Sequence, residues 1–289
     1  MILIAESGST KTDWIAINRD GNVIFSTQTL GLNASVLASD ILFRRIKKND
    51  LIYSQKNDVE KIYFYGAGLG IESAVDRIEE VLSQIFENSS LSLHEDTHAA
   101  VYATVDKGKP AIVGILGTGS NCSFYDGKRI EQKVSSLGYI IMDEASGNFF
   151  GKQLIRSYYF NELSQEMATK LESKYDLNPN TIKDHLYRKE NPNTYLAGVG
   201  KFVIQNKKYP LFRTFIFEGL HRFIEHQIFQ FPNCYDVPVH FIGSVAYYLE
   251  QEIKIALDNY GLKLGRIVKR PIDRLVVYHQ ELLKQDSAI

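Results

Sequence analysis

The residues most suited to chemistry near the start of the chain follow a short apolar run. Residues 3–5 are apolar, and the string ESGSTKTD comes directly after them at residues 6–13. Glycine and hydroxyl side chains in a turn offer backbone N–H groups and short donors, which suit phosphate oxygens. Lys11 adds a cation, while Glu6 and Asp13 add oxygen ligands of the kind that Mg²⁺ prefers. A polar hairpin with no ligand is the alternative.

A second turn of the same kind lies about a hundred residues further on. Residues 111–116 are apolar, and GTGSNC follows at residues 117–122. Two such turns, one in each half of the chain, predict that a polyphosphate is bound from both sides. The chain contains neither the G-x-x-x-x-G-K-[ST] motif nor a G-x-G-x-x-G that opens a helix, so P-loop and Rossmann nucleotide sites are not predicted.

A third glycine turn and several acids are further candidates. Gly243, in HFIGSVAYYL, would let the backbone approach a flat ring closely, although helix–strand packing explains a glycine equally well. Asp96 precedes a helix expected from Thr97, so it is either a reactive acid or an N-cap. Asp143 lies in GYIIMDEASGNFFG before another helix, where capping is again the alternative. Asn33, in GLNAS, is a turn asparagine by default.

Metal and disulfide chemistry find little support in the sequence. HEDTH, at residues 94–98, matches the zinc-binding H-E-x-x-H string formally, but it lies at an expected strand-to-helix junction rather than within a helix. The two cysteines, Cys122 and Cys234, exclude a disulfide framework and a four-cysteine metal site within one chain.

The elements around the two turns repeat. Each turn follows an apolar strand and leads into a hairpin, which favours a duplicated unit. The expected strands are 2–5, 14–17 and 23–26 in the first copy, and 111–116, 121–125 and 129–134 in the second. A strand is expected within 61–70, a helix at 71–85, and a short strand before Asp96. Helical patterns cover 150–176, 194–206 and 212–231, a strand, turn and helix follow at 237–261, and a closing helix lies at 273–285.

Strands with interspersed helices predict an α/β protein. Its 289 residues are enough for two domains, which we expect at 1–110 and 111–289 on either side of a cleft, with the last helix free to pack back on the first domain. The net charge of −1 gives no general nucleic-acid footprint. We see no membrane span or secretion signal, so a cytoplasmic protein without a membrane partner is expected.

Taken together and in this order, ESGSTKTDW, GAG, an aspartate opening a helix, GTGSNC, DEASG and GSVA resemble the BadF/BadG-type ATPase family over nearly the whole chain. Within that family the resemblance is to the N-acetylglucosamine kinases, and the wider group is the sugar kinase, heat-shock cognate and actin superfamily. The resemblance implies two ribonuclease-H-like (actin-like ATPase) domains, with ATP and sugar in the cleft between them. It implies ATP-dependent phosphorylation of N-acetylglucosamine or a related amino sugar or hexose, and it leaves a homodimer open.

The resemblance also implies roles for individual residues. Asp96 falls where these kinases keep the acid that accepts the proton of the sugar hydroxyl, and Glu6 is expected to bind Mg²⁺ through water. The residues implied in ATP binding are Gly8, Ser9, Thr10, Lys11, Thr12, Gly117, Thr118, Gly243 and Ser244. Those implied in sugar binding are Asn33, Gly119, Asn121 and Asp143.

Two departures from the family pattern keep other functions open. Glu6 stands where the family has aspartate, and Met142 and Ala145 stand where it has glycines, one of which could need a positive φ. A degenerate protein that binds sugar or ATP without catalysis is therefore an alternative. An ATPase that activates a dehydratase would need grouped cysteines for an iron–sulfur cluster, and the two cysteines lie in distant segments. A sugar-responsive repressor would need an added helix-turn-helix, which we do not expect.

Overall fold

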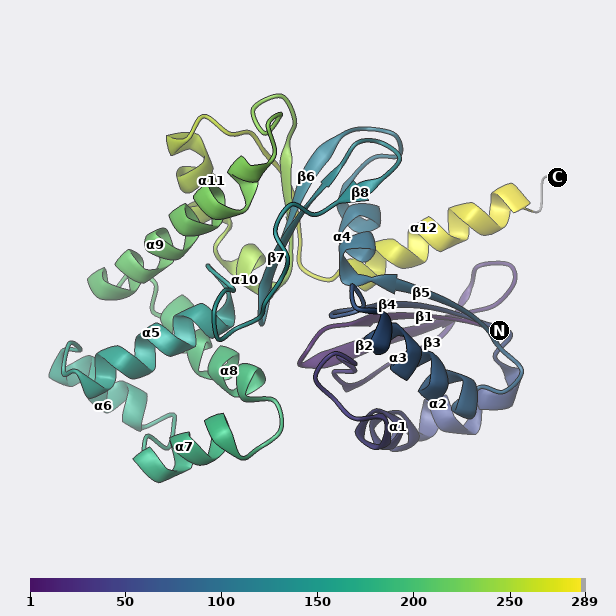
Figure 1. The fold of residues 1–289 in the computed structure, drawn as a ribbon, viewed down its shortest axis with the longest axis horizontal. Coiled ribbons are helices and arrows are strands. Elements are labelled where there is room, and N and C mark those ends of the chain that lie inside the picture. Colours follow the sequence, from purple (N-terminus) through teal and green to yellow (C-terminus); the bar gives the residue numbers. More distant parts are fainter. Residues whose placement is uncertain (287–289) are drawn as a thin grey trace. The chain divides into compact units, whose positions relative to one another are not determined.

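A computed structural model describes residues 1–286 of the protein, and the chain divides into two compact units. Unit 1 is Met1–Lys107 together with the chain from Arg270 onward, and unit 2 is Gly108–Lys269. Each unit has one five-stranded mixed sheet and its own set of helices (Figure 1). The predicted α/β class, with two ribonuclease-H-like units, is confirmed.

The sheet of unit 1 has the strand order β3-β2-β1-β4-β5. β1 pairs antiparallel with β2 and parallel with β4, and β5 continues the parallel side. The strands are β1 (Ile2–Ser7), β2 (Lys11–Ile17), β3 (Val23–Leu30), β4 (Lys61–Gly66) and β5 (Ser90–Glu95). β1 and β2 extend further than predicted, so the polar residues Glu6, Lys11 and Asp13 are part of the ladder itself.

Helices cover both faces of this sheet (Figure 1). They are α1 (Ser39–Lys47), α2 (Asp50–Ser54), the 3₁₀ turn η1 (Lys56–Asp58), α3 (Glu72–Ile85), α4 (Asp96–Thr104) and α12 (Pro271–Asp286). Because strand side chains alternate between faces, Leu3 and Trp14 are buried in the core with α1 and α3, whereas Ile2 and Ile4 are buried in a separate core with α4 and α12.

The sheet of unit 2 repeats this topology, since its order β10-β9-β6-β7-β8 is that of unit 1 listed from the other edge. The first three strands are antiparallel, and β9 and β10 continue parallel to β6. The strands are β6 (Ala111–Leu116), β7 (Ser120–Tyr125), β8 (Ile130–Glu131), β9 (Val239–Ile242) and β10 (Leu264–Val268). The strand predicted at 129–134 is therefore much shorter than expected.

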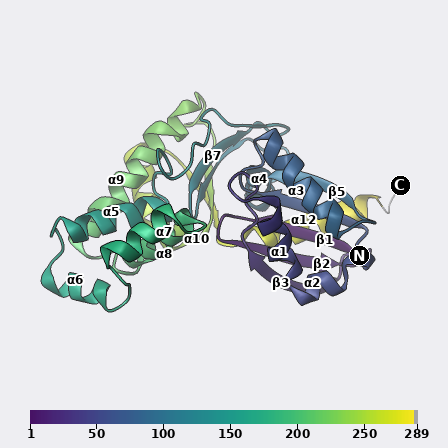
Figure 2. The ribbon, with the colours of Figure 1, turned by 60° about the horizontal axis from the view of Figure 1, so that its bottom comes forward.

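Unit 2 also carries a helical insertion between β8 and β9. It comprises α5 (Gly147–Tyr159), α6 (Gln165–Glu172), α7 (Pro179–Tyr187), α8 (Pro192–Gln205), α9 (Pro210–His226) and the 3₁₀ turn η2 (Ile228–Gln230). Between β9 and β10 lie α10 (Ser244–Tyr248) and α11 (Glu250–Asn259). Figure 2 shows α5–α8 gathered beside one another within this unit. Across residues 1–286, we find no helix with the length and apolar character needed to span a membrane.

The helical pattern at 150–176 forms two helices, α5 and α6. The chain leaves the helix after Tyr159, because Asn161 adopts a left-handed conformation with φ 56°, and Ser164 then caps α6 by accepting the N–H of Met167. α5 instead packs closely on α8. A methyl group on Gly151 would lie 2.0 Å from the Leu196 carbonyl oxygen, so only glycine allows this contact.

Candidate functional site

The first turn of unit 1 joins β1 to β2, and strand register arranges its acids. Glu6 and Asp13 face each other across the two strands, on the same side of the sheet as Ile4. The next pair, Ser7 and Thr12, points to the opposite side because side chains alternate along a strand. The polar string at the start of the chain therefore supplies two different surfaces, one acidic and one lined by hydroxyls.

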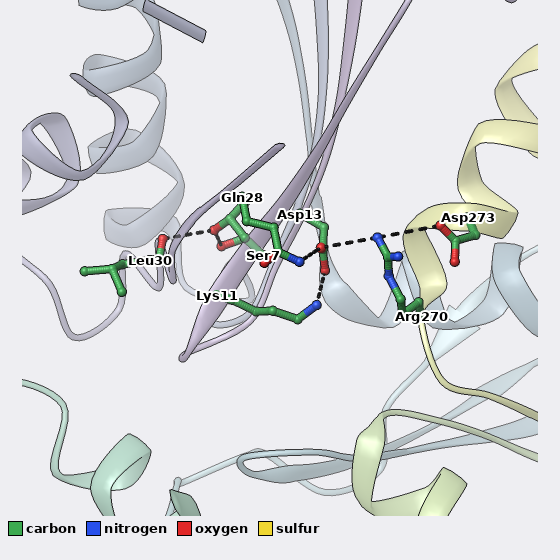
Figure 3. A network of polar contacts seen from close by, with 8 residues as sticks. Ser7, Lys11, Asp13, Gln28, Leu30, Arg270 and Asp273 are labelled. Atoms are coloured by element: carbon green, nitrogen blue, oxygen red, sulfur yellow. Dashed lines mark hydrogen bonds and ion pairs between the residues drawn. The ribbon is translucent and has the colours of Figure 1, made fainter. Parts of the chain in front are cut away.

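Asp13 is the anchor of the acidic surface (Figure 3). Its carboxylate is 2% exposed, forms an ion pair with Lys11, and accepts a 2.6 Å hydrogen bond from Gln28 Nε2. Arg270, at the start of α12, lies 3.5 Å from the same carboxylate. Asp13 is thus held by three donors within unit 1. Lys11, predicted from the sequence to bind a phosphate group, forms its ion pair with Asp13 in this structure.

The hydroxyl pair is buried. The Ser7 and Thr12 hydroxyl oxygens lie 2.8 Å apart, the Leu32 N–H donates to Ser7 Oγ at 3.1 Å, and Thr12 Oγ1 donates to the Leu30 carbonyl. Both side chains are 0% exposed. The Thr12 hydroxyl, predicted to bind the nucleotide, therefore holds the end of β3 to the first turn and is not offered to a ligand.

Asp96 lies close to the acidic surface as the first residue of α4. The helix begins at Asp96 rather than Thr97, its N-cap residue is Glu95, and no side chain caps it. The N-cap interpretation of Asp96 is therefore wrong. Burial, and to a smaller extent Glu95, raises the pKa of Asp96 from 3.8 to about 7, although the Thr97 N–H opposes this shift. A carboxylate with such a pKa can accept a proton near neutral pH.

Glu6 has the same property. Burial, followed by the carboxylates of Asp13 and Asp96, raises the pKa of Glu6 from 4.5 to about 7, against the opposing charges of Lys11 and Arg270. A bound cation would relieve this crowding of negative charge. No group of three or more His, Cys, Asp or Glu side chains in residues 1–286 is placed to hold a metal ion. The donor set therefore fits hydrated Mg²⁺, which keeps several of its waters, rather than a closed protein cage.

The H-E-x-x-H string does not form a zinc-protease motif. His94 lies on β5 and His98 on α4, so the two rings are not presented by one helix, although their centroids are 5.3 Å apart.

Asn33 reaches the first turn from the segment after β3. Its Nδ2 donates to Ser9 Oγ at 3.3 Å, and its Oδ1 accepts from the Ser35 N–H and hydroxyl at 3.0 and 2.7 Å. The turn role expected of this asparagine is therefore present. Gly68 packs directly over it, since a methyl group there would lie 2.5 Å from Asn33 Oδ1.

The second turn, Gly117–Gly119 in unit 2, is held by backbone groups from the start of α5. The Gly147 N–H donates to the Gly117 carbonyl at 2.9 Å, and the Asn148 N–H donates to the Thr118 carbonyl at 3.0 Å. A methyl group on Gly117 would meet no atom within 4 Å, and one on Gly8 in the first turn would meet only the Lys11 carbonyl at 3.8 Å. Both turns therefore have open space beside the backbone, as a phosphate site requires.

Asp143 lies against this second turn. Its buried carboxylate accepts hydrogen bonds from the Ser120 N–H and from Asn148 Nδ2, both at 3.1 Å. A methyl group on Gly119 would lie 2.7 Å from Asp143 Oδ2, so that glycine allows the close contact. Burial raises the pKa of Asp143, while these two donors and Lys152 oppose the shift.

The two glycine replacements near Asp143 have different consequences. Ala145 has φ 57°, so it occupies the left-handed conformation that a glycine would adopt without strain, whereas Met142 has no positive φ. Ala145 is fully buried, and Gly219 of α9 makes room for it, since a methyl group on Gly219 would lie 3.1 Å from the Ala145 backbone. The loop therefore keeps a glycine-like backbone with an alanine.

The remaining predicted residues also lie near the second turn or on its strands. Asn121, on β7, accepts the Cys122 N–H with its own side chain at 2.8 Å. Gly243 has φ 108°, and a methyl group there would lie 2.4 Å from the Leu116 carbonyl oxygen at the end of β6. Packing between strand ends thus explains this glycine, and Ser244 begins α10 directly after it.

No protein-family model matches the chain. The chain is similar to the "putative N-acetylglucosamine kinase" of Porphyromonas gingivalis, with 29% identity and a TM-score of 0.87 over 97% of this chain and 99% of that chain. The protein of the same description from Chromobacterium violaceum is 16% identical, with a TM-score of 0.65 over 96% and 97%.

A ROK family glucokinase from Streptomyces griseus, solved with glucose and AMPPNP, is 13% identical, with a TM-score of 0.59 over 98% of this chain and 99% of that chain. The similarity to the Chromobacterium and Streptomyces proteins shows the fold alone. All three are described as kinases of sugars, and the similarity agrees with the α/β fold of two units that the motifs predicted.

The sequence did not reveal three residues that shape these sites. Arg270 reaches Asp13 across 257 residues of sequence, and no local pattern signals such a contact. The role of the Ser120 N–H was not predicted, because a sequence pattern does not show which backbone N–H groups bind a side chain. Asn148 left one signal, since an asparagine inside a helix is unfavourable unless its side chain has a specific partner.

Proposed function

We propose that the protein is an ATP-dependent sugar kinase that transfers the terminal phosphoryl group of ATP to a hydroxyl of N-acetylglucosamine or a closely related amino sugar or hexose. The observation that carries this proposal is Asp96, a half-buried carboxylate with a pKa of about 7 beside the acidic end of the first turn. The similarity to the Porphyromonas gingivalis protein supports it.

The phosphate groups are the ligands of the two glycine turns in this proposal. Both turns have open space beside a glycine, at Gly8 and at Gly117, and Gly243 and Ser244 lie at the strand end where the adenosine would be bound. ATP supplies the phosphoryl group, and Mg²⁺ neutralises the charge that spreads over its oxygens. Glu6 would hold the ion, and a cation near it would lower its raised pKa.

Each unit contains polar groups that are candidates for binding the sugar. Asp143 is a buried acceptor for sugar hydroxyls, and Asn33, Gly119 and Asn121 add donors and acceptors close to the turns. Asp96 orients the attacking hydroxyl and accepts its proton. The protein's contribution is positioning and charge stabilisation, as phosphoryl transfer requires.

An ADP-release assay tests this proposal. The purified protein is incubated with Mg-ATP and, one at a time, a panel of amino sugars and hexoses, with a no-sugar control for background ATP hydrolysis. We expect sugar-dependent ADP release with at least one amino sugar, and a matching phosphorylated product by mass spectrometry. Absence of ADP release with every sugar would refute the kinase. If calorimetry then showed sugar binding, the degenerate sugar-binding protein would be supported, which the pairing of Lys11 with Asp13 favours.

A further inference from the structure

One buried polar side chain beside the second turn has no role in the reaction as proposed so far. Asn148 lies in the first turn of α5 and is 1% exposed. Its Nδ2 donates to Asp143 Oδ2 at 3.1 Å, and its backbone N–H donates to the Thr118 carbonyl at 3.0 Å. Its Oδ1 has no hydrogen-bond partner among residues 1–286, although a buried polar atom without a partner is unfavourable.

This arrangement selects one state of Asp143. An asparagine can present either N–H₂ or C=O to a neighbour. With N–H₂ toward Asp143, the amide stabilises the ionised carboxylate, whereas a flipped amide would place two acceptors together. The Ser120 N–H acts in the same direction from β7, on the other carboxylate oxygen at 3.1 Å. Two donors, from α5 and β7, therefore oppose the burial that favours the neutral acid.

We propose that Asn148 is a positioning residue. Its side chain fixes the Asp143 carboxylate as an acceptor for the sugar, and its backbone bonds to the second turn at the Thr118 carbonyl. The inference rests on the proposed function, because it assigns Asp143 to the sugar. The side chain of Asn148 acts on Asp143, while its backbone N–H, which a side-chain substitution leaves in place, bonds to the second turn.

The charges around Asp143 set the expected pH behaviour. Besides the two neutral donors, Lys152 on α5 favours the ionised carboxylate, and Glu144 in the adjoining loop disfavours it. Lys152 also donates to the Tyr139 carbonyl. Loss of the Asn148 amide should therefore raise the pKa of Asp143 further. A protonated Asp143 is a poorer acceptor, so sugar binding should weaken at a higher pH than in the wild type.

The test compares Asn148→Ala and Asn148→Ser with a matched control, Asn206→Ala. Asn206 is a part-buried asparagine at the end of α8 that donates to the Phe202 carbonyl and has no contact with the second turn. In Asn148→Ala we expect the KM for the sugar to rise about 10- to 100-fold, the worth of a hydrogen bond to a charged group. The KM for ATP should change much less, and the acidic limb of kcat/KM for the sugar should move to higher pH.

Asn148→Ser keeps a short polar group and should fall between the wild type and Asn148→Ala, and it serves as the test if the alanine variant does not fold. A purely structural role would raise both KM values together, lower the melting temperature and leave the acidic limb of kcat/KM in place. We expect at most these changes in the control, Asn206→Ala. That result in the Asn148 variants would overturn the inference.

A measurement without substrate separates this inference from the proposed function. The pKa of the Asp143 carboxyl can be followed by ¹³C NMR in the protein alone, and it should be higher in Asn148→Ala or Asn148→Ser than in the wild type. An unchanged pKa would refute the positioning role even if the wild type is an active sugar kinase. A raised pKa in a protein that phosphorylates no sugar would instead retain the Asn148–Asp143 coupling and refute the kinase.

Discussion

The two units share a scaffold but differ in the charge placed on it. In both, the first strand turns into the second through glycine, and the strand order is the same. In unit 1 the residues beside the turn, Glu6 and Asp13, are acids paired across the strands. At the matching position in unit 2, Ile115 pairs with Asn121. A repeated fold therefore repeats the glycine turn, whereas the pair of acids facing each other beside it, which we propose for the cation, is found in unit 1.

A second correspondence is visible in how each turn is supported from the side. In unit 1 the segment after β3 returns Asn33 to Ser9 in the turn, and in unit 2 the segment after β8 returns Asp143 to the Ser120 amide. The supporting residue thus comes from the same point in the topology. Unit 1 uses a neutral amide beside a charged turn, and unit 2 uses a carboxylate beside a neutral one.

The largest expected effect comes from the acid that only unit 1 provides. Asp96→Asn preserves volume but cannot accept a proton, so kcat should fall by roughly 10²- to 10⁴-fold. Asp143→Asn, in unit 2, should act mainly on the KM for the sugar. Steady-state kinetics of both variants, with their melting temperatures, check this division. A folded Asp96→Asn protein that keeps more than about a tenth of wild-type kcat would move the base elsewhere, with Asp143 the next candidate.

Acid should act on unit 1 through a buried histidine of α12, His279. His279 is 2% exposed, and burial, followed by His94 and Lys61, lowers its pKa from 6.5 to about 4. As the pH falls from about 6.5 to about 4, the unfolded chain binds a proton that the folded protein does not. The contribution of His279 to the free energy of unfolding should therefore decrease through that range by about 3 kcal/mol, whereas the raised pKa values of Glu6 and Asp96 act in the opposite direction, so the comparison with a His279 variant isolates its share.

Fluorescence of Trp14, the chain's one tryptophan and fully buried in unit 1, reports this transition. Far-UV circular dichroism follows both units in the same acid titration. His279→Gln removes the titrating group, so its tryptophan transition should shift to lower pH. An identical transition in the variant and the wild type would show that His279 does not carry the effect.

We expect substitutions beside the two turns to differ in their effect on the free energy of unfolding. Gly243→Ala forces a methyl group toward the Leu116 carbonyl at a φ of 108°, and it should lower the free energy of unfolding by about 3 kcal/mol. Ser7→Ala in unit 1 removes hydroxyl hydrogen bonds and should cost about 1 kcal/mol. Gly261→Ala, with φ 70° and no atom within 4 Å, isolates the dihedral strain. Urea unfolding compares the three, and equal losses for Gly243→Ala and Gly261→Ala would contradict the packing contribution.

The smallest effect concerns the metal ion. Glu6→Gln keeps the shape of the side chain but loses its charge, so the free Mg²⁺ concentration for half-maximal rate should rise about tenfold, the lower end for a residue that acts through water. Asn121→Ala, at the position in unit 2 that corresponds to Asp13, should leave the Mg²⁺ requirement unchanged. Initial rates at fixed ATP and varied Mg²⁺ test both. An unaltered requirement in Glu6→Gln would place the ion elsewhere.

Local patterns predicted the parts of the fold that depend on neighbouring residues. The strand at 111–116 and the helix ending at Ile85 agree with β6 and α3, because apolar periodicity is a local signal. Sequence patterns did not predict α1, α7 or β10. β10 is short and contains Gly265, and α1 has no capping side chain to mark its start. The helical pattern at 150–176 did not show that Asn161, in a left-handed conformation, separates two helices there.

The site shows the same limit. Glycine turns and their flanking acids were visible because they lie within a few residues of one another. The burial of the Thr12 hydroxyl, the pairing of Lys11 with Asp13 and the contact of Arg270 depend on strand register and on the return of α12, which no short motif encodes. The start of α4 differs by one residue from the expected one, so Asp96 is the first residue of the helix and not its N-cap.

The position of α12 has a consequence for how the chain is made. Ile272, Leu275 and Val276 complete the core that Ile2 and Ile4 begin, and Tyr65 bonds to His279 across 214 residues of sequence. A ribosome therefore finishes the whole of unit 2 before it supplies the last layer of unit 1. Unit 2, continuous in sequence, can fold as it emerges, while one face of the first sheet waits uncovered until the final helix is synthesised. The segment translated first is the last to be completed.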